Sequence, residues 1–232
     1  MQQFFTPELT SKDKQYVFEE QESKHIARVL RKKSGDQIRL TNGKGNLFWG
    51  SLEVLSPKKC IVTISKCEYI DPPKVTVHMA VAPTKNMDRF EWFLEKATEL
   101  GVHRVTPILC DRSERKQLKI ERCNKIIASA VKQSLRAYTP VLDPLTPLKE
   151  VKTEASIVCM AHCDNGSKTP LKKTLKNQSN SCILIGPEGD FTKDEIDWAK
   201  ENKMKMIHLG DARLRTETAA LVSLHTALLL NP

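Results

Sequence analysis

The sequence predicts an α/β protein with two domains, a small β-rich domain over residues 1–71 and a larger domain with a mainly parallel sheet over residues 74–232. Three observations predict this fold class. Asp71, Pro72 and Pro73 mark a boundary, because two consecutive prolines can neither continue a helix nor donate to a sheet ladder. Before the boundary, short alternating segments are separated by turns. After it, apolar strand-like segments alternate with helical ones, which is typical of a parallel sheet covered by helices.

In the first domain, alternating segments predict strands over 37–40, 47–55 and 60–65. Turn residues separate them, so a small antiparallel barrel is expected. One short helix is expected over 23–33, with an apolar face inward and a basic face outward that includes Arg28 and Arg31. Such a face is usually only solvated, but it also fits a nucleic-acid surface, and the sequence favours neither reading.

In the second domain, Gly101 predicts the end of a helix, and Thr192 with Glu195 forms a capping box that predicts the start of another. The last helix is apolar on almost every side, which places it inside the domain or in a subunit interface. The polar segment 164–181 is expected to contain an exposed loop. Strands are expected over 75–82, 102–109, 156–161, 182–185 and 205–209, and helices over 88–100, 118–138, 192–202 and 216–230.

Composition limits the class of protein. The net charge of +9 in 232 residues suits a surface that meets polyanions, although solubility alone also explains it. No apolar stretch approaches the roughly 20 residues that span a bilayer, and the first residues lack the layout of a secretory signal, so a cytoplasmic protein is expected. Seven scattered cysteines disfavour disulfides. Cys159, His162 and Cys163 resemble half of a metal site, but no second pair completes four ligands, so no metal is expected.

Two glycine-bearing loops, 185–190 and 209–216, are the best candidates for a ligand site. Each follows a predicted strand and leads into a predicted helix, and ligands of open α/β sheets bind at the carboxyl ends of strands. Taken alone, the first loop is also an ordinary turn, with Gly189 supplying a positive φ. The usual fingerprints of dinucleotide-binding folds, P-loop NTPases, serine hydrolases and zinc proteases are absent from the sequence.

The order and spacing of several motifs resemble the RsmE family of ribosomal RNA methyltransferases, which belongs to the SPOUT superfamily. The similar segments cover most of the chain and are Phe4-Phe5, His25 to Arg31, Asp88 to Trp92, Glu95 to Val102, Pro107, Arg112 to Glu114, Lys132 to Arg136, Ile185 to Gly189 and Leu214 to Ala219.

That resemblance implies an N-terminal PUA-like β-barrel, a C-terminal α/β domain tied in a trefoil knot, and a homodimer. It implies methyl transfer from S-adenosylmethionine to N3 of a uridine of 16S rRNA in the small ribosomal subunit, the family target being uridine 1498. Arg215 and Glu217 become the catalytic candidates, and water or another carboxylate is an equal candidate for the base. The implied RNA contacts are Arg28, Arg31, Lys85, Arg112 and Arg136. The implied cofactor-binding residues are Ile185, Gly186, Pro187, Glu188, Gly189, Leu209, Gly210 and Leu214.

Three departures from the family pattern bear on these implications. Asp190 and Asp211 stand where the family commonly has glycine or proline, and Asp tolerates left-handed backbone better than most residues. The segment around Lys85 also departs from the family form, which affects the role of that lysine. The alternatives are a SPOUT methyltransferase acting on a ribose 2'-OH or on transfer RNA, and a non-catalytic RNA-binding factor of ribosome assembly.

Overall fold

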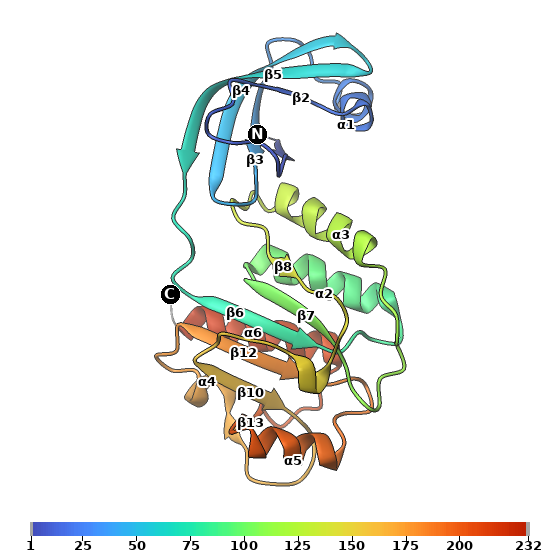
Figure 1. Cartoon of the computed structure of the whole chain (residues 1–232), viewed down its shortest axis with the longest axis vertical. Coiled ribbons are helices and arrows are strands. Elements are labelled where there is room, and N and C mark those ends of the chain that lie inside the picture. The colour runs from blue at the N-terminus through green and yellow to red at the C-terminus, as the bar shows by residue number, and fades with distance from the viewer. Residues whose placement is uncertain (1, 231–232) are drawn as a thin grey trace. The chain divides into compact units, whose positions relative to one another are not determined.

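The computed structural model describes residues 2–230, so residues 1, 231 and 232 of the predicted domains lie outside the described part. Figure 1 shows the course of the chain. The chain forms two compact units: residues 1–72 together with 131–139, and residues 73–130 together with 140–232. Within the described residues, no helix has both the length and the apolar character needed to cross a membrane.

The first unit holds a five-stranded sheet in the order β1-β3-β4-β5-β2. The strands are β1 (Gln3–Phe5), β2 (Gln15–Val17), β3 (Gln37–Thr41), β4 (Asn46–Ser56) and β5 (Lys59–Tyr69). The expected strands are present and their successive pairs are antiparallel, but β1 pairs with β3 in parallel. The antiparallel pairing expected from the hairpin pattern is therefore present between β3, β4 and β5, and β1 adds a parallel pair in a segment where no strand was expected.

The basic helix of the first unit lies earlier than the sequence predicts. It begins as α1 (Glu20–Lys24) and continues as the π-helix η1 (His25–Val29), with Ile26 fully buried. Arg31 adopts a left-handed conformation with φ 51°, which ends the helix before residue 33. Both Arg28 and Arg31 are exposed.

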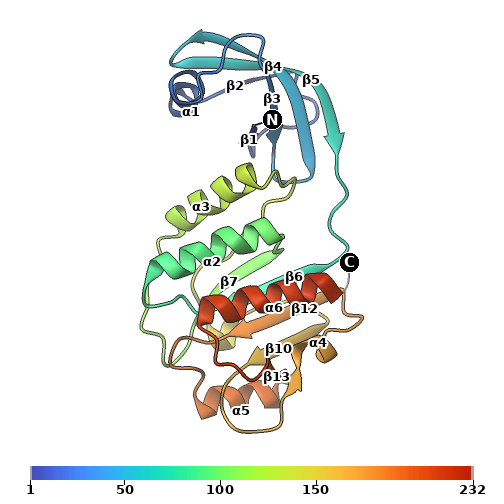
Figure 2. The same ribbon diagram turned by 180° about the vertical axis from the view of Figure 1, so that it is seen from behind.

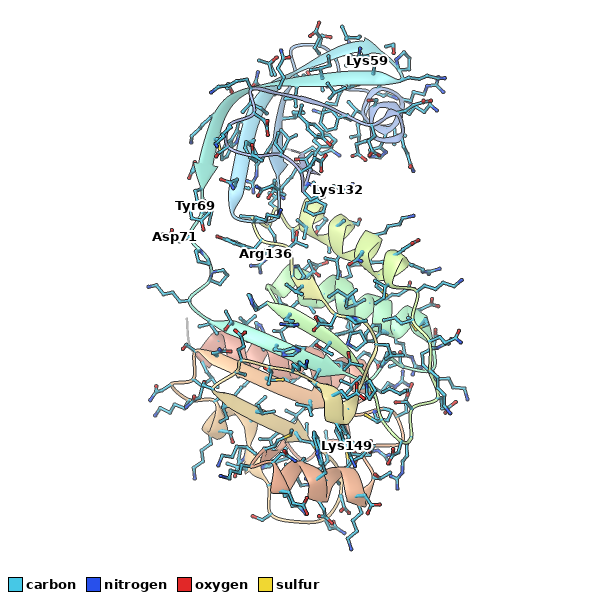
Figure 3. All side chains as sticks on the ribbon, in the orientation of Figure 1. Lys59, Tyr69, Asp71, Lys132, Arg136 and Lys149 are labelled. Carbon is cyan, nitrogen blue, oxygen red and sulfur yellow. The ribbon has the colours of Figure 1, made fainter. Side chains whose placement is uncertain are left out.

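Residues 131–139 belong to the first unit because the N-terminal strands hydrogen-bond to them. The Gln3 side chain donates to the carbonyls of Val131, at 3.1 Å, and Arg136, at 2.9 Å. Leu135 has φ 57°, so helix α3 (Ile120–Gln133) ends five residues before the predicted Tyr138. Figure 3 labels Arg136, just after this helix, and Tyr69 at the end of β5.

The second unit holds an eight-stranded sheet in the order β11-β13-β10-β12-β6-β7-β8, with β9 also pairing with β7, and every pair is parallel. The parallel sheet and the small N-terminal sheet of the predicted fold class are thus confirmed, and the trefoil knot stays a prediction. The strands are β6 (Thr76–Val81), β7 (Arg104–Leu109), β8 (Val141–Leu142), β9 (Thr146–Pro147), β10 (Ile157–Ala161), β11 (Thr169–Pro170), β12 (Asn180–Ile185) and β13 (Lys205–His208).

Helices cover this sheet on both faces. On one face, which is toward the viewer in Figure 2, α2 (Met87–Leu100) and α6 (Thr216–Leu230) pack on a core that includes Val77, Met79 and Phe93. On the other face, α5 (Lys193–Glu201) packs with the 3-10 helix η2 (Leu148–Glu150). The predicted capping box at Thr192 and Glu195 is present, and Gly101 ends α2 with φ 99°.

The segment 164–181 is less irregular than its composition indicates. It contains β11 and the short helix α4 (Leu171–Thr174), which is anchored by the buried side chains of Leu171 and Leu175. These two leucines, four residues apart, are the local signal for the helix. The exposed loop expected here is present before β11, and a second exposed turn, residues 176–179, connects α4 to β12.

Candidate functional site

Three loops surround one cavity in the second unit. In the sheet, β10 lies between β12 and β13, and Ala161 is in register with Ile185 on one side and Ile207 on the other. Because the strands are parallel, their carboxyl ends and the loops that follow come together. The cavity has a volume of about 990 Å³ and is lined from residues 161–168, 185–191 and 207–216. Both predicted glycine loops therefore face the same space.

The first glycine loop, residues 185–190, is fixed by neighbouring elements. Thr216 donates its hydroxyl to the Gly186 carbonyl at 3.1 Å, and Arg112 donates to the Gly189 carbonyl at 2.9 Å. The Glu188 carboxylate accepts from the Lys85 backbone N–H at 2.9 Å. Asp190 accepts from the Cys163 N–H at 2.7 Å, which joins this loop to the loop after β10.

Gly189 is required for a different reason from the one the turn pattern indicates. The positive φ of this loop, 61°, belongs to Asp190 and not to Gly189. A Cβ at Gly189 would lie 3.3 Å from the Cβ of Arg112, closer than ordinary side-chain packing. The expectation that Gly189 supplies the left-handed residue was therefore wrong, because the Asp190 side chain caps the turn and stabilises that conformation there.

The second glycine loop, residues 209–215, is held by few contacts. Gly210 has φ 118°, a conformation that favours glycine, and a Cβ there would meet no atom within 4 Å. Its N–H donates to the ring of nearby His208 at 3.3 Å. Leu214 packs against the core, while the Arg215 side chain is exposed and lines the cavity.

Sequence reasoning did not assign the third loop, residues 161–168, to the ligand site. It considered Cys159, His162 and Cys163 only as an incomplete metal site, and it predicted an exposed loop from residue 164 onward. His162 lines the cavity and is 8% exposed, and neither of its ring nitrogens has a hydrogen-bond partner. Burial lowers the pKa of His162, which favours the neutral ring. Lys168 donates to the His162 and Asp164 carbonyls at 3.1 and 2.7 Å, which closes the loop. The available signal was that this loop also follows a strand of the parallel sheet.

The two catalytic candidates occupy different environments. Arg215 lines the cavity, whereas Glu217 does not, and its side chain is only 10% exposed. The Glu217 carboxylate lies 3.9 Å from Nε of Arg89, a cavity-lining residue that the sequence analysis did not name. Arg89 lies in the segment Asp88 to Trp92 that carries the family resemblance, but no role was assigned to it from the sequence.

The candidate RNA contacts are divided between the two units. Arg28, Arg31 and Arg136 belong to the first unit, and burial lowers the pKa of Arg136. Lys85 and Arg112 belong to the second unit. Lys85 forms an ion pair with Glu114 at 2.8 Å, while Arg112 supports the first glycine loop.

The possible metal ligands of the second unit are scattered. Within residues 2–230, no three His, Cys, Asp or Glu side chains are grouped as metal ligands would be. Of the pair discussed above, Cys159 is buried in its strand and Cys163 is exposed at the cavity, and all seven cysteines are free thiols.

Comparison with known proteins agrees with this geometry. A family described as RNA methyltransferase domain matches residues 71–228, and one described as RNA methyltransferase PUA domain matches residues 18–65. The curated protein named ribosomal RNA small subunit methyltransferase E from Rickettsia conorii is 29% identical over 212 residues, which cover 89% of this chain and 86% of that protein.

Solved structures show the same similarity over the whole chain. A protein of Porphyromonas gingivalis described as a probable rRNA-methyltransferase has a TM-score of 0.91 at 35% identity, covering 100% of this chain and 98% of that one. The ribosomal RNA small subunit methyltransferase E of Neisseria gonorrhoeae, solved bound to S-adenosyl methionine, has a TM-score of 0.87 at 25% identity, with the same coverage. Since the RNA methyltransferase domain match spans more than half of the sequence, the chain belongs to the RsmE family of RNA methyltransferases.

Proposed function

We propose that this protein transfers a methyl group from S-adenosylmethionine to N3 of a uridine of 16S rRNA in the small ribosomal subunit. The single observation that carries the proposal is the cavity at the ends of β10, β12 and β13, formed by the two glycine loops of a chain that matches the RNA methyltransferase family over residues 71–228. The names of the relatives support the ribosomal substrate. The uridine and its N3 atom are the finer part of the proposal.

The residues of the cavity fit S-adenosylmethionine. A volume of about 990 Å³ is in the range of small-molecule sites. A Cβ at Gly186 would lie 3.1 Å from the Phe191 ring and one at Gly189 3.3 Å from Arg112 Cβ, so both glycines let this loop pack closely on its neighbours beside the cavity. The buried His162 ring has two unpartnered nitrogens, and a buried polar group of this kind needs a hydrogen-bond partner. We assign the binding of the cofactor to Ile185, Gly186, Pro187, Glu188, Gly189, Leu209, Gly210 and Leu214.

When bound, S-adenosylmethionine supplies a sulfonium-linked methyl group to a nucleophilic nitrogen. Uracil N3 carries a proton that must leave before or during attack, and negative charge then develops on O2 and O4. Arg215 lines the cavity and is exposed, so its guanidinium can stabilise that charge. The proton passes to water or to a carboxylate within hydrogen-bond reach.

RNA binding would combine phosphate contacts with extrusion of the target base. Arg28 and Arg31 of the first unit are exposed and are our main candidates for phosphate contacts. The Arg112 side chain also holds the first glycine loop, so substituting it would change more than RNA affinity, whereas the Lys85 side chain pairs with Glu114. Arg136 is partly buried and completes the set.

The surface of the second unit is compatible with a homodimer, which we include in the proposal. Trp92 of α2 is 46% exposed, and Val222 and Leu229 of α6 are 40% and 65% exposed. We take these exposed apolar side chains as the candidates for a subunit interface, which a contiguous apolar patch would mark. A ribosomal substrate favours the cytoplasm as the place of action.

The test is methyl transfer from labelled S-adenosylmethionine to small subunits that lack the modification, followed by mass analysis of the methylated nucleoside. We expect 3-methyluridine. A 2'-O-methylated nucleoside would show that the acceptor is a ribose hydroxyl and not uracil N3. Methylation of transfer RNA in place of 16S rRNA would likewise contradict the proposed substrate. Salt-dependent RNA binding without cofactor binding or turnover would favour a non-catalytic assembly factor.

A further inference from the structure

Glu217 is a buried carboxylate with one charged neighbour. It lies in the first turn of α6, its side chain is 10% exposed, and Nε of Arg89 is 3.9 Å from its Oε1. Burying a carboxylate is costly unless it is paired. The amino terminus of α6 also adds a favourable field for an acidic side chain in its first turn.

Arg89 connects that buried charge to the cavity. It lies in the first turn of α2, which Asn86 caps, and its side chain is 41% exposed. Only its Nε is paired with Glu217, and within residues 2–230 the Arg89 side chain makes no further hydrogen bond or ion pair. Its Nη groups therefore keep free donors at the wall that Arg215 also lines.

Adjacent residues at the start of α6 thus face different partners. Arg215 is exposed to the cavity, Thr216 bonds to the Gly186 carbonyl, and Glu217 faces Arg89. A general base has to come within hydrogen-bond reach, about 3 Å, of the proton that it takes. Glu217 does not line the cavity, so it is badly placed to reach a substrate proton.

We propose that Arg89 binds an anionic oxygen of the RNA substrate, and that Glu217 is a positioning residue that orients Arg89 rather than the base of the reaction. This inference rests on the proposed function. The anionic oxygen is either a phosphate oxygen of the target nucleotide or a uracil carbonyl oxygen that gains charge as N3 loses its proton. RNA is favoured over the cofactor as the source because the Arg89 side chain is 41% exposed, so a large substrate can reach it from solvent.

The test compares the R89A, R89K and E217Q variants and the R89A/E217Q double variant. The matched control is R122A with E91Q, since Arg122 and Glu91 form an Arg–Glu pair at 2.6 Å in the same unit and neither residue lines the cavity. For each variant, kcat and KM for small subunits, the Kd for small subunits by filter binding, and the Kd for S-adenosylmethionine by calorimetry are measured.

We expect R89A to lower kcat/KM at least tenfold, R89K to recover part of that loss, and the cofactor Kd to stay within twofold. E217Q should act in the same direction with a smaller effect, and the double variant should be no worse than R89A, because Glu217 acts through Arg89. A change in KM and RNA Kd assigns the phosphate, and a change in kcat alone assigns the uracil oxygen. The control pair should leave all four values unchanged.

Three results would overturn the inference. A cofactor Kd raised tenfold by R89A would place the contact on the cofactor. An E217Q loss that persists undiminished in the R89A background would make Glu217 act independently, as a base would. If the wild type shows no turnover, the proposed function fails, and filter binding alone decides: an RNA Kd that R89A leaves unchanged removes Arg89 from RNA recognition.

Discussion

The two glycine loops flank the same strand, β10, yet they are held very differently. The loop after β12 is fixed by hydrogen bonds from Thr216, Arg112 and Cys163, and by Glu188 bonding to the 84–86 segment. The loop after β13 is held mainly by the short bond from Gly210 to His208. A ligand between the two loops would contact one loop that is already fixed in the folded protein and one loop that becomes ordered only when the ligand binds.

This difference has an energetic meaning. Ordering a loop at the moment of binding subtracts from affinity, whereas a loop ordered by the fold does not. The first loop should therefore supply most of the affinity for the cofactor, and the second should adapt to it. Each loop contains a glycine followed by an aspartate, and each is lined by an arginine, so the same residue type can be changed at both loops and the effects compared.

The largest expected effect comes from the glycine pair. In G189V the Cβ of the new side chain would lie 3.3 Å from Arg112 Cβ, and the rest of the valine needs still more space, so the fixed loop must move. We expect a loss of cofactor affinity of about 100-fold, which is about 2.8 kcal/mol. In G210A the new methyl group meets open space and only the φ of 118° is strained, so a loss of less than about tenfold is expected.

Calorimetric titration with S-adenosylmethionine checks this pair, with circular dichroism as a control for folding. Equal losses in folded G189V and G210A proteins would show that the two walls contribute alike. Normal binding by G189V would place the cofactor outside this loop.

Local sequence patterns predicted where the first glycine loop lies, but they did not predict the hydrogen bonds that hold it. The strand before it and the capping box after it are local patterns, and both are present. Arg112 donates to Gly189, 77 positions away in sequence, and the Lys85 N–H donates to Glu188, 103 positions away. No local sequence pattern contains either pair. The placement of the positive φ at Asp190 likewise depends on a bond to the distant Cys163.

The same limit explains the other errors. Residues 131–139 join the first unit through bonds to Gln3, which is more than 120 residues away. The loop after β10 was overlooked because polar composition was given more weight than its place at the end of a central strand. The pairing of Arg89 with Glu217 depends on the packing of α2 against α6, which no local sequence pattern contains.

The aspartate pair should show an intermediate difference. Asp190 accepts from the N–H groups of Cys163 and Phe191 and holds a left-handed backbone, whereas Asp211 has no hydrogen bond or ion pair within the described residues. D190A should weaken cofactor binding about tenfold, because it leaves two N–H groups without their acceptor. D190N should retain part of the affinity, since Asn also tolerates positive φ. D211A should change the cofactor Kd less than about twofold, and an effect as large as that of D190A would remove the distinction between the loops.

The arginine pair should give the smallest difference. Arg112 donates to the carbonyls of Gly189, at 2.9 Å, and Phe191, at 3.4 Å, while Arg213 lines the cavity without a hydrogen bond or ion pair in the part of the chain that the structure describes. The Arg112 bonds are partly exposed, so R112A should cost about 1 kcal/mol, or about fivefold in cofactor Kd. R213A removes a charge of the same sign from the opposite wall but no support for the backbone, and its cofactor Kd should stay within about twofold. Titrations at two salt concentrations separate these causes, because a loss by R112A that disappears at high salt would be a general charge effect and not the loss of a brace.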